Sequence, residues 1–175
     1  MLWIALYLPH LPLQALERAL PGQPPRPALA VVDDRKLIAI NRAAAMLGLR
    51  LGQSAATAQS LAPQLQLRPR DPDRERAFVQ ALALALGQFT PQLCPQAGGV
   101  LIEVAASLRL FGGLRRLRRR IEAVVRQCGA RARLATGRTA NAAWLLASHG
   151  ATAAPAAQGS PARSRDARRL DALPL

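Results

Sequence analysis

The chain has 175 residues, half of them hydrophobic, and 24 Lys and Arg side chains against 10 Asp and Glu give a net charge of +14. This length suffices for one domain or two small ones, and the cationic excess favours a polyanion such as nucleic acid over an acidic small molecule as partner. Cys94 and Cys128 stand alone, without CxxC or Cys/His spacing, which argues against zinc or a disulfide framework and fits a reducing cytoplasm.

The first half of the chain predicts short strands and helices separated by proline and glycine. Residues 2–8 form an apolar run typical of a buried strand, which Pro9 ends before a helix over residues 13–20. The run is too short to cross a membrane and lacks the basic segment of a signal peptide, so we expect no membrane association. The other expected elements are a proline-rich connector at residues 21–27, a hairpin from residues 28–32 and 36–40, a helix capped by Asn41, a second helix opened by Gly52 and Ser54, and an extended piece at residues 64–70.

The second half predicts helices alternating with strands. Asp71 and Pro72 begin a long helix, and the glycine-bounded residues 98–113 form an apolar run typical of a buried strand. The remaining expected elements are an amphipathic helix over residues 114–128, a strand over 131–136, a helix over 139–148 and a flexible tail over 151–175. This order predicts an α/β fold, with helices packed on a ferredoxin-like sheet and a small insert in the first half.

Glu103 stands in the middle of the expected central strand, and its carboxylate has two interpretations. It is either a glutamate that is paired or faces a sheet edge, or the remnant of a metal-binding catalytic strand. It is the one acid among 10 that falls within an expected core strand, and no second carboxylate is placed to share a metal pair with it.

Five segments stand in an order and spacing that point to one family. They are MLWIALYLPHLPLQALE at residues 1–17, NRAAAMLGLRLG at 41–52, Leu61-Ala62-Pro63, the stretch from Phe89-Thr90-Pro91 to GVLIEVAASLRLFGG, and ATGRTANAAWLLAS at 135–148. Together they resemble the Y-family (UmuC-like) translesion DNA polymerases, and within these the ImuB-like branch.

The resemblance implies a division of the chain. Residues 1–20 and 71–150 correspond to a palm, residues 21–70 to a fingers insert, and residues 151–175 to a flexible tail or the start of a thumb. Because a thumb and a further DNA-gripping domain are expected in the family, we expect this chain to be a fragment or a shortened gene product.

The resemblance also implies a degenerate active site. Family members bind two Mg²⁺ ions through carboxylates, and the corresponding positions here are Leu8, His10 and Ile102, with Glu103 the one acid retained. The positions that contact the nucleotide triphosphate correspond to Arg42 and Ala45. A catalytically inactive relative, with no metal and no cofactor, is therefore expected.

Two further segments suggest binding surfaces. The first is a set of arginines expected on the exposed face of the amphipathic helix: Arg115, Arg116, Arg118, Arg119 and Arg126. Their guanidinium groups either contact the phosphates along a DNA backbone or are simply solvated. The second is residues 107–111, SLRLF, which resemble the short motif by which bacterial proteins bind the sliding clamp. Because these residues continue the expected buried strand, we expect them to pack in the core and not to bind a clamp.

Three functions follow from these observations. The resemblance implies a non-catalytic adaptor in damage-induced mutagenic DNA repair, with DNA, a RecA-like accessory protein, an error-prone replicative-type polymerase and the sliding clamp as partners. The first alternative is a weakly active translesion polymerase that requires Mg²⁺. The second is a simple basic DNA-binding domain.

Overall fold

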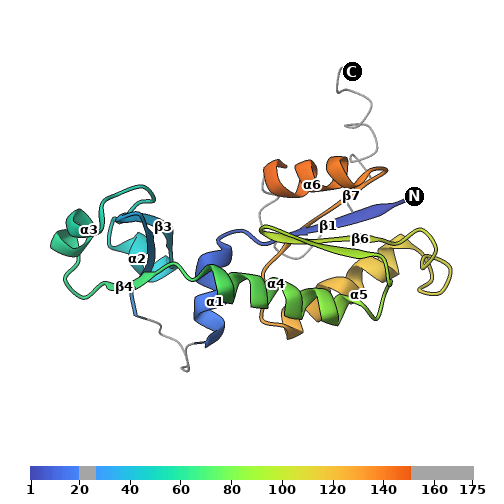
Figure 1. Ribbon diagram of the computed structural model, residues 1–175, viewed down its shortest axis with the longest axis horizontal. Coiled ribbons are helices and arrows are strands. Elements are labelled where there is room, and N and C mark those ends of the chain that lie inside the picture. Colours follow the sequence, from blue (N-terminus) through green and yellow to red (C-terminus); the bar gives the residue numbers. More distant parts are fainter. Residues whose placement is uncertain (20–26, 151–175) are drawn as a thin grey trace, which may run out of the picture.

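Short apolar strands and the helices between them build two β-sheets in the computed structural model, which describes residues 1–19 and 27–150 (Figure 1). The larger sheet is ordered β5 (Leu93–Gln96), β6 (Gly99–Glu103), β1 (Trp3–Tyr7) and β7 (Arg133–Gly137). Every neighbouring pair is antiparallel. With α4 (Pro72–Leu86) and α5 (Leu114–Gln127) as its crossovers, the sheet has the ferredoxin-like order, and the predicted α/β fold is confirmed.

Helices cover both faces of the larger sheet. α4 and α5 lie on one face and α6 (Ala140–His149) lies on the other (Figure 1). Alternation along β1 explains the two layers, because successive side chains of a strand point to opposite faces. Ile4 and Leu6 are buried against α4 and α5, whereas Ala5 packs with Ala143 and Ala147 of α6.

The smaller sheet is ordered β3 (Lys36–Ile40), β2 (Leu29–Asp33) and β4 (Gln66–Pro69). β2 runs antiparallel to β3 and parallel to β4. Two short helices, α2 (Arg42–Met46) and α3 (Ala55–Leu61), add Ala44 and Ala58 to this unit's core, and the loops next to them add Leu49, Ala62 and Leu65.

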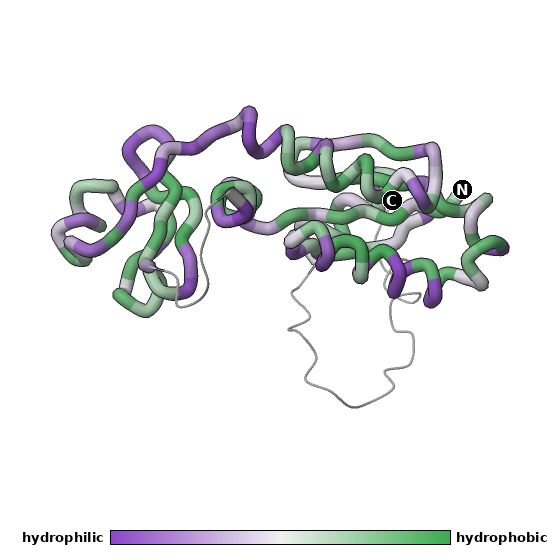
Figure 2. The backbone as a smooth tube through the Cα atoms, turned by 90° about the horizontal axis from the view of Figure 1, so that it is seen from below, coloured by the Kyte–Doolittle hydropathy of each residue, from purple (hydrophilic) through white to green (hydrophobic). Residues whose placement is uncertain are grey.

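Two segments join the sheets. The first is α1 (Leu11–Ala19), which lies between them in Figure 1. Leu13 of α1 packs with Leu29 and Val31 of the smaller sheet, while Leu11 belongs to the core of the larger one. The second is the link from β4 to α4, the hydrophilic stretch that crosses between the two units in Figure 2.

Polar side chains begin the helices where the sequence predicts them. Asn41, Ser54 and Asp71 each accept a hydrogen bond from the backbone N–H three residues along, which satisfies a donor that the first helical turn leaves free. Asn41 also accepts a hydrogen bond from the Leu29 N–H and donates to the Pro27 carbonyl oxygen, so it fixes α2 to β2.

The expected strand over residues 98–113 is wrong beyond residue 103. β6 ends at Glu103, and the chain then folds back in turns, with the Ser107 N–H bonded to the Val104 carbonyl at 3.1 Å. Leu110 is consequently 80% exposed, whereas Leu108 and Phe111 pack against the core. The clamp-like segment 107–111 is thus a partly exposed turn and not part of a buried strand.

The second difference is β5, which was not expected because Pro95 interrupts its pattern. As an edge strand it needs no ladder hydrogen bond on its outer side, and this position tolerates proline. Within the described residues, no helix combines the length and the apolar composition that a bilayer crossing needs. The tail predicted at residues 151–175 and most of the connector at 21–27 lie outside the described residues.

Candidate functional site

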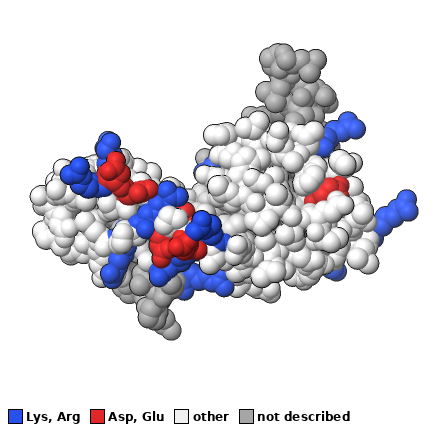
Figure 3. All heavy atoms as spheres, in the orientation of Figure 1, with Lys and Arg blue, Asp and Glu red and all other residues white. Residues whose placement is uncertain are grey.

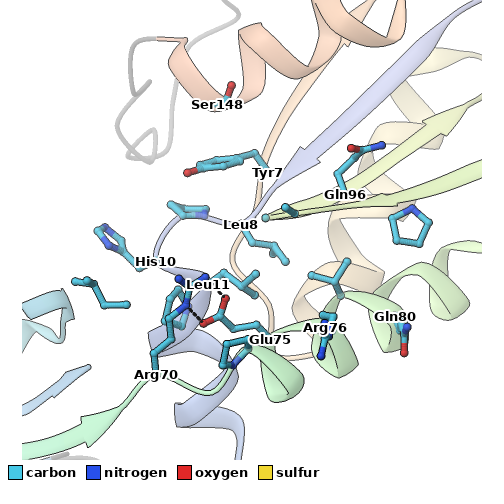
Figure 4. A pocket seen from close by; sticks show the side chains of 18 of the residues that line it. Tyr7, Leu8, His10, Leu11, Arg70, Glu75, Arg76, Gln80, Gln96 and Ser148 are labelled. Atoms are coloured by element: carbon cyan, nitrogen blue, oxygen red, sulfur yellow. Dashed lines mark hydrogen bonds and ion pairs between the residues drawn. The ribbon is translucent and has the colours of Figure 1, made fainter. Parts of the chain in front are cut away.

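A cavity of about 800 Å³ opens at one end of the larger sheet, where β1 leads into α1 and β5 turns into β6 (Figure 4). This volume lies within the range of small-molecule binding sites. Side chains from several parts of the fold meet in it. The larger unit contributes Tyr7 at the end of β1, Leu8 and His10 after it, Glu75, Arg76 and Gln80 on α4, Gln96 beside the β5–β6 turn, Arg133 on β7, and Ser148 on α6, and the smaller unit contributes Ile38 on β3 and Arg70 after β4.

Leu8 and His10, the two first-strand positions predicted from the resemblance, lie at this cavity. Leu8 is 1% exposed and contributes to the core beneath α4 and α5. His10 is exposed at the turn into α1, with a left-handed backbone (φ 54°), and its carbonyl oxygen accepts the N–H groups of Leu13 and Gln14.

Ile102 and Glu103, the predicted second-strand positions, lie at the opposite end of the sheet. Glu103 pairs with Trp3, whereas the residue opposite Tyr7 is Gly99. The prediction that Glu103 shares a site with Leu8 and His10 is therefore wrong. The reason is the register: the chain reverses just before Gly99, so β6 starts at the cavity and runs away from it.

Glu103 has a structural environment instead. Its side chain is buried, and Oε1 accepts hydrogen bonds from the backbone N–H groups of Leu2 at 2.9 Å and Ala105 at 3.2 Å. The carboxylate thus fixes the start of β1 against the end of β6, which agrees with the paired-glutamate interpretation.

Glycines occupy the strand positions that face the end of β1. The Leu8 N–H donates to the Gly98 carbonyl oxygen at 2.8 Å. A Cβ atom at Gly99 would stand 1.9 Å from the Leu6 carbonyl oxygen, so no larger residue fits there without moving the backbone. No carboxylate from this strand reaches the cavity.

Glu75 is the only carboxylate among the described residues that line the cavity, and it is occupied by Arg70. Arg70 Nε lies 2.8 Å from Glu75 Oε1, and Nη2 lies 3.0 Å from Oε2 (Figure 4). Nη1 of Arg70 also reaches Asp33 Oδ2 of the smaller sheet at 3.1 Å. Hydrogen bonding to Glu75 and then to Asp33 raises the pKa of the Arg70 guanidinium above its ordinary value.

This donor set does not fit a pair of Mg²⁺ ions, which require several carboxylate or carbonyl oxygens that are free to coordinate. Both oxygens of Glu75 face a guanidinium, and within the described residues no group of three or more His, Cys, Asp or Glu could hold a metal ion. Glu75 was not predicted as a site residue, because its burial and its place at the cavity depend on how α4 packs in the folded chain.

The predicted nucleotide-contact positions lie outside this cavity. Arg42 and Ala45 are exposed on α2, and neither is among the lining residues. The arginines that do line it, Arg70, Arg76 and Arg133, were not predicted, since their juxtaposition depends on tertiary structure.

The arginines of α5 form a separate surface. The side chains of Leu117, Ile121 and Val125 are buried against the sheet, so most of the arginines point outward. Those that are exposed as predicted are Arg115, Arg116, Arg119 and Arg126. Arg118 is half-buried instead, because it donates to Glu122 at 3.1 Å and to the Leu134 carbonyl oxygen at 3.3 Å.

A ferredoxin-like sheet whose first crossover carries a second, smaller sheet is the fold of the palm and fingers of Y-family DNA polymerases. The family model described as the impB/mucB/samB family matches residues 13–148, and the chain belongs to that family.

Individual relatives agree with this assignment. Protein ImuB of Caulobacter vibrioides (strain NA1000 / CB15N) is 32% identical over 114 residues, which are 65% of this chain and 25% of the relative. DinB from Sulfolobus solfataricus has a TM-score of 0.59 at 16% identity, covering 79% of this chain and 42% of that chain. A post-insertion binary complex of Dbh DNA polymerase has a TM-score of 0.62 at 17% identity, covering 78% and 42%. The predicted ImuB-like relationship is confirmed, and the chain spans about a quarter of the curated relative's length.

Proposed function

We propose that this chain is the palm and fingers part of a non-catalytic Y-family polymerase homologue that acts as an adaptor in damage-induced mutagenic DNA repair. The observation that carries the proposal is the donor set of the cavity. Two-metal phosphoryl transfer needs clustered carboxylates that hold both ions against the attacking and leaving oxygens. Here Glu75, the one lining carboxylate in the part of the chain that the structure describes, is neutralised by Arg70, and glycines stand where a second strand could supply others.

Manganese titration tests the loss of the metal site. Mn²⁺, followed by its electron paramagnetic resonance signal, should show no saturable binding to this chain, and Glu75→Gln should leave the signal unchanged. Glu122→Gln is the matched control, since it removes an acid of α5 outside the cavity. Saturable Mn²⁺ binding that Glu75→Gln abolishes and Glu122→Gln preserves would favour the alternative of a weakly active polymerase. The full-length protein should then incorporate nucleotides in primer extension.

DNA is the first partner of the proposed adaptor. Its support is the exposed row of Arg115, Arg116 and Arg119 on α5, since guanidinium groups pair with phosphates and release their counterions. The affinity for primer–template DNA should fall steeply as the salt concentration rises. Charge reversal of the three arginines should make the slope of log K against log [salt] less negative by roughly 2–3, at about 0.9 per phosphate contact. Charge reversal of Arg35, Arg50 and Arg68, three exposed arginines of the smaller unit, is the control with the same change in net charge. No binding at low salt by folded protein would contradict the DNA contact.

The protein partners of the adaptor rest on likeness to Protein ImuB. A RecA-like accessory protein, an error-prone replicative-type polymerase and the sliding clamp are the proposed set. Gel filtration of purified mixtures tests each pair in turn. DNA binding without any such association would favour the alternative of a simple basic DNA-binding domain.

A further inference from the structure

The cavity at the end of β1 has the electrostatic character of an anion site. Among the described residues, three arginines line it, Arg70, Arg76 and Arg133, against the single carboxylate of Glu75. Such an excess of guanidinium groups in a concave site raises the local concentration of anions. Two of the three are already engaged, because Arg70 binds Glu75 and Asp33, and Arg76 binds Asp73.

Arg133 is the cation that is available to a ligand. Within the described part of the chain, its half-buried side chain makes no hydrogen bond or ion pair. It stands directly across from Tyr7 in the β1–β7 ladder, and the Tyr7 hydroxyl likewise has no partner among the described residues. With His10, these side chains place around one cavity several hydrogen-bond donors that have no partner among the described residues; Figure 4 shows Tyr7 and His10 at its edge.

The backbone that carries Arg133 is fixed. Gln14 of α1 is buried, and it spans the gap to the loop before β7. Its Oε1 accepts the Arg131 N–H at 2.7 Å, and its Nε2 donates to the Arg131 carbonyl oxygen at 2.9 Å and to the Pro9 carbonyl oxygen at 2.6 Å. Gln14 therefore holds the His10 and Arg133 sides of the cavity at a set spacing, which lowers the entropic cost of binding a ligand between them.

We propose that this cavity binds a phosphate group directly, without a divalent cation, and that Arg133 is its principal donor. The inference rests on the proposed non-catalytic function, because a two-metal site would place cations where this site places guanidinium groups. A guanidinium suits phosphate, since its planar fork can donate two parallel hydrogen bonds to two phosphate oxygens. The residues differ from Arg42 and Ala45, the positions at which the family resemblance implies contact with a nucleotide.

The probe is inorganic tripolyphosphate, titrated calorimetrically in EDTA at fixed ionic strength. The unmodified chain should bind it, and Arg133→Gln should weaken binding at least tenfold. Arg138→Gln is the matched control, because Arg138 is an exposed arginine just beyond the other end of β7 and outside the cavity; it should change affinity less than twofold. Arg133→Lys keeps the charge and should retain intermediate binding, with thermal unfolding confirming that each variant is folded.

Three results would overturn the proposal: no binding in EDTA, binding that appears only with Mg²⁺, or equal weakening by Arg133→Gln and Arg138→Gln. The last would mean general attraction to a cationic protein. None of these alters the Mn²⁺ experiment with Glu75→Gln, so failure of the phosphate site is distinguishable from failure of the non-catalytic function. If tripolyphosphate binds, competition by a deoxynucleoside triphosphate or by a 5′-phosphorylated oligonucleotide, with its 5′-hydroxyl form as control, identifies the source of the phosphate.

Discussion

At the scale of single residues, Glu103 illustrates how a buried acid can be structural. It is 7% exposed, yet both of its hydrogen-bond donors are backbone N–H groups, from Leu2 and Ala105. A carboxylate that receives such charge-assisted bonds is satisfied without a metal ion. The sequence leaves its role open, because a strand residue cannot be assigned to either end of a sheet until the pairing register is known.

The contacts of Glu103 predict its contribution to stability. Glu103→Ala leaves the N–H groups of half-buried Leu2 and exposed Ala105 without their acceptor and should lower the free energy of unfolding by about 1–2 kcal/mol. Glu103→Gln keeps an acceptor oxygen and should cost about half as much. Urea denaturation measures both, with Glu122→Ala, whose pair with Arg118 is partly exposed, as a control expected to cost under about 1 kcal/mol. An alanine variant as stable as the original chain would show that the two bonds contribute nothing.

At the scale of elements, the β2–β3 hairpin contains two non-glycine residues in the left-handed region. Asp33 pairs with Lys36, so the loop is Asp34-Arg35, with φ of 45° and 60°. This is the geometry of a type I′ turn, in which glycine is preferred at the second position. Arg35→Gly should raise the free energy of unfolding by about 1 kcal/mol, because it removes the steric cost of the left-handed backbone. Thermal denaturation measures the gain.

Arg35→Ala is the control for this hairpin. It removes the same charge but keeps a Cβ atom, so it should give no such gain. If alanine stabilises the chain as much as glycine does, the effect comes from charge and not from backbone conformation.

Elements that local chemistry specifies could be predicted, and those that depend on pairing could not. The caps at Asn41, Ser54 and Asp71 act over three residues, and the sequence contains the whole interaction. β5 and the true end of β6 instead depend on which strand lies alongside, and Pro95 hides β5 from a pattern search. The same limit explains the site: the element order predicts the sheet, whereas the place of Glu103 required the register.

At the scale of the whole molecule, Arg70 links the two sheets. It follows β4 directly, and it bonds Asp33 at the end of β2 and Glu75 in the first turn of α4. Charged side chains gather around this junction in Figure 3, whereas the face over the larger sheet is mostly uncharged. The other link, α1, meets the smaller sheet through apolar packing, which is non-directional, with Leu13 against Leu29 and Val31. We therefore expect Arg70 to fix the angle between the units and α1 to keep them in contact.

Loss of Arg70 should loosen the junction without unfolding either sheet. Arg70→Ala leaves the buried Glu75 unpaired, so it should lower the free energy of unfolding by about 1–2 kcal/mol. This is the value for a charged hydrogen bond, reduced because Arg70 is partly exposed to solvent. Asp33→Asn removes only the exposed ion pair between Arg70 and Asp33, so it should lower the free energy of unfolding by less than half as much. Spin labels on Cys94 and on Ala45→Cys, in a Cys128→Ser background, measure the distance between the two units. The distribution of this distance should broaden for Arg70→Ala and stay narrow for Asp33→Asn. An unchanged distance distribution in both variants would mean that α1 alone sets the angle between the units. Its packing would then hold that angle after loss of the only ion-pair network that, within the described residues, bridges the two sheets.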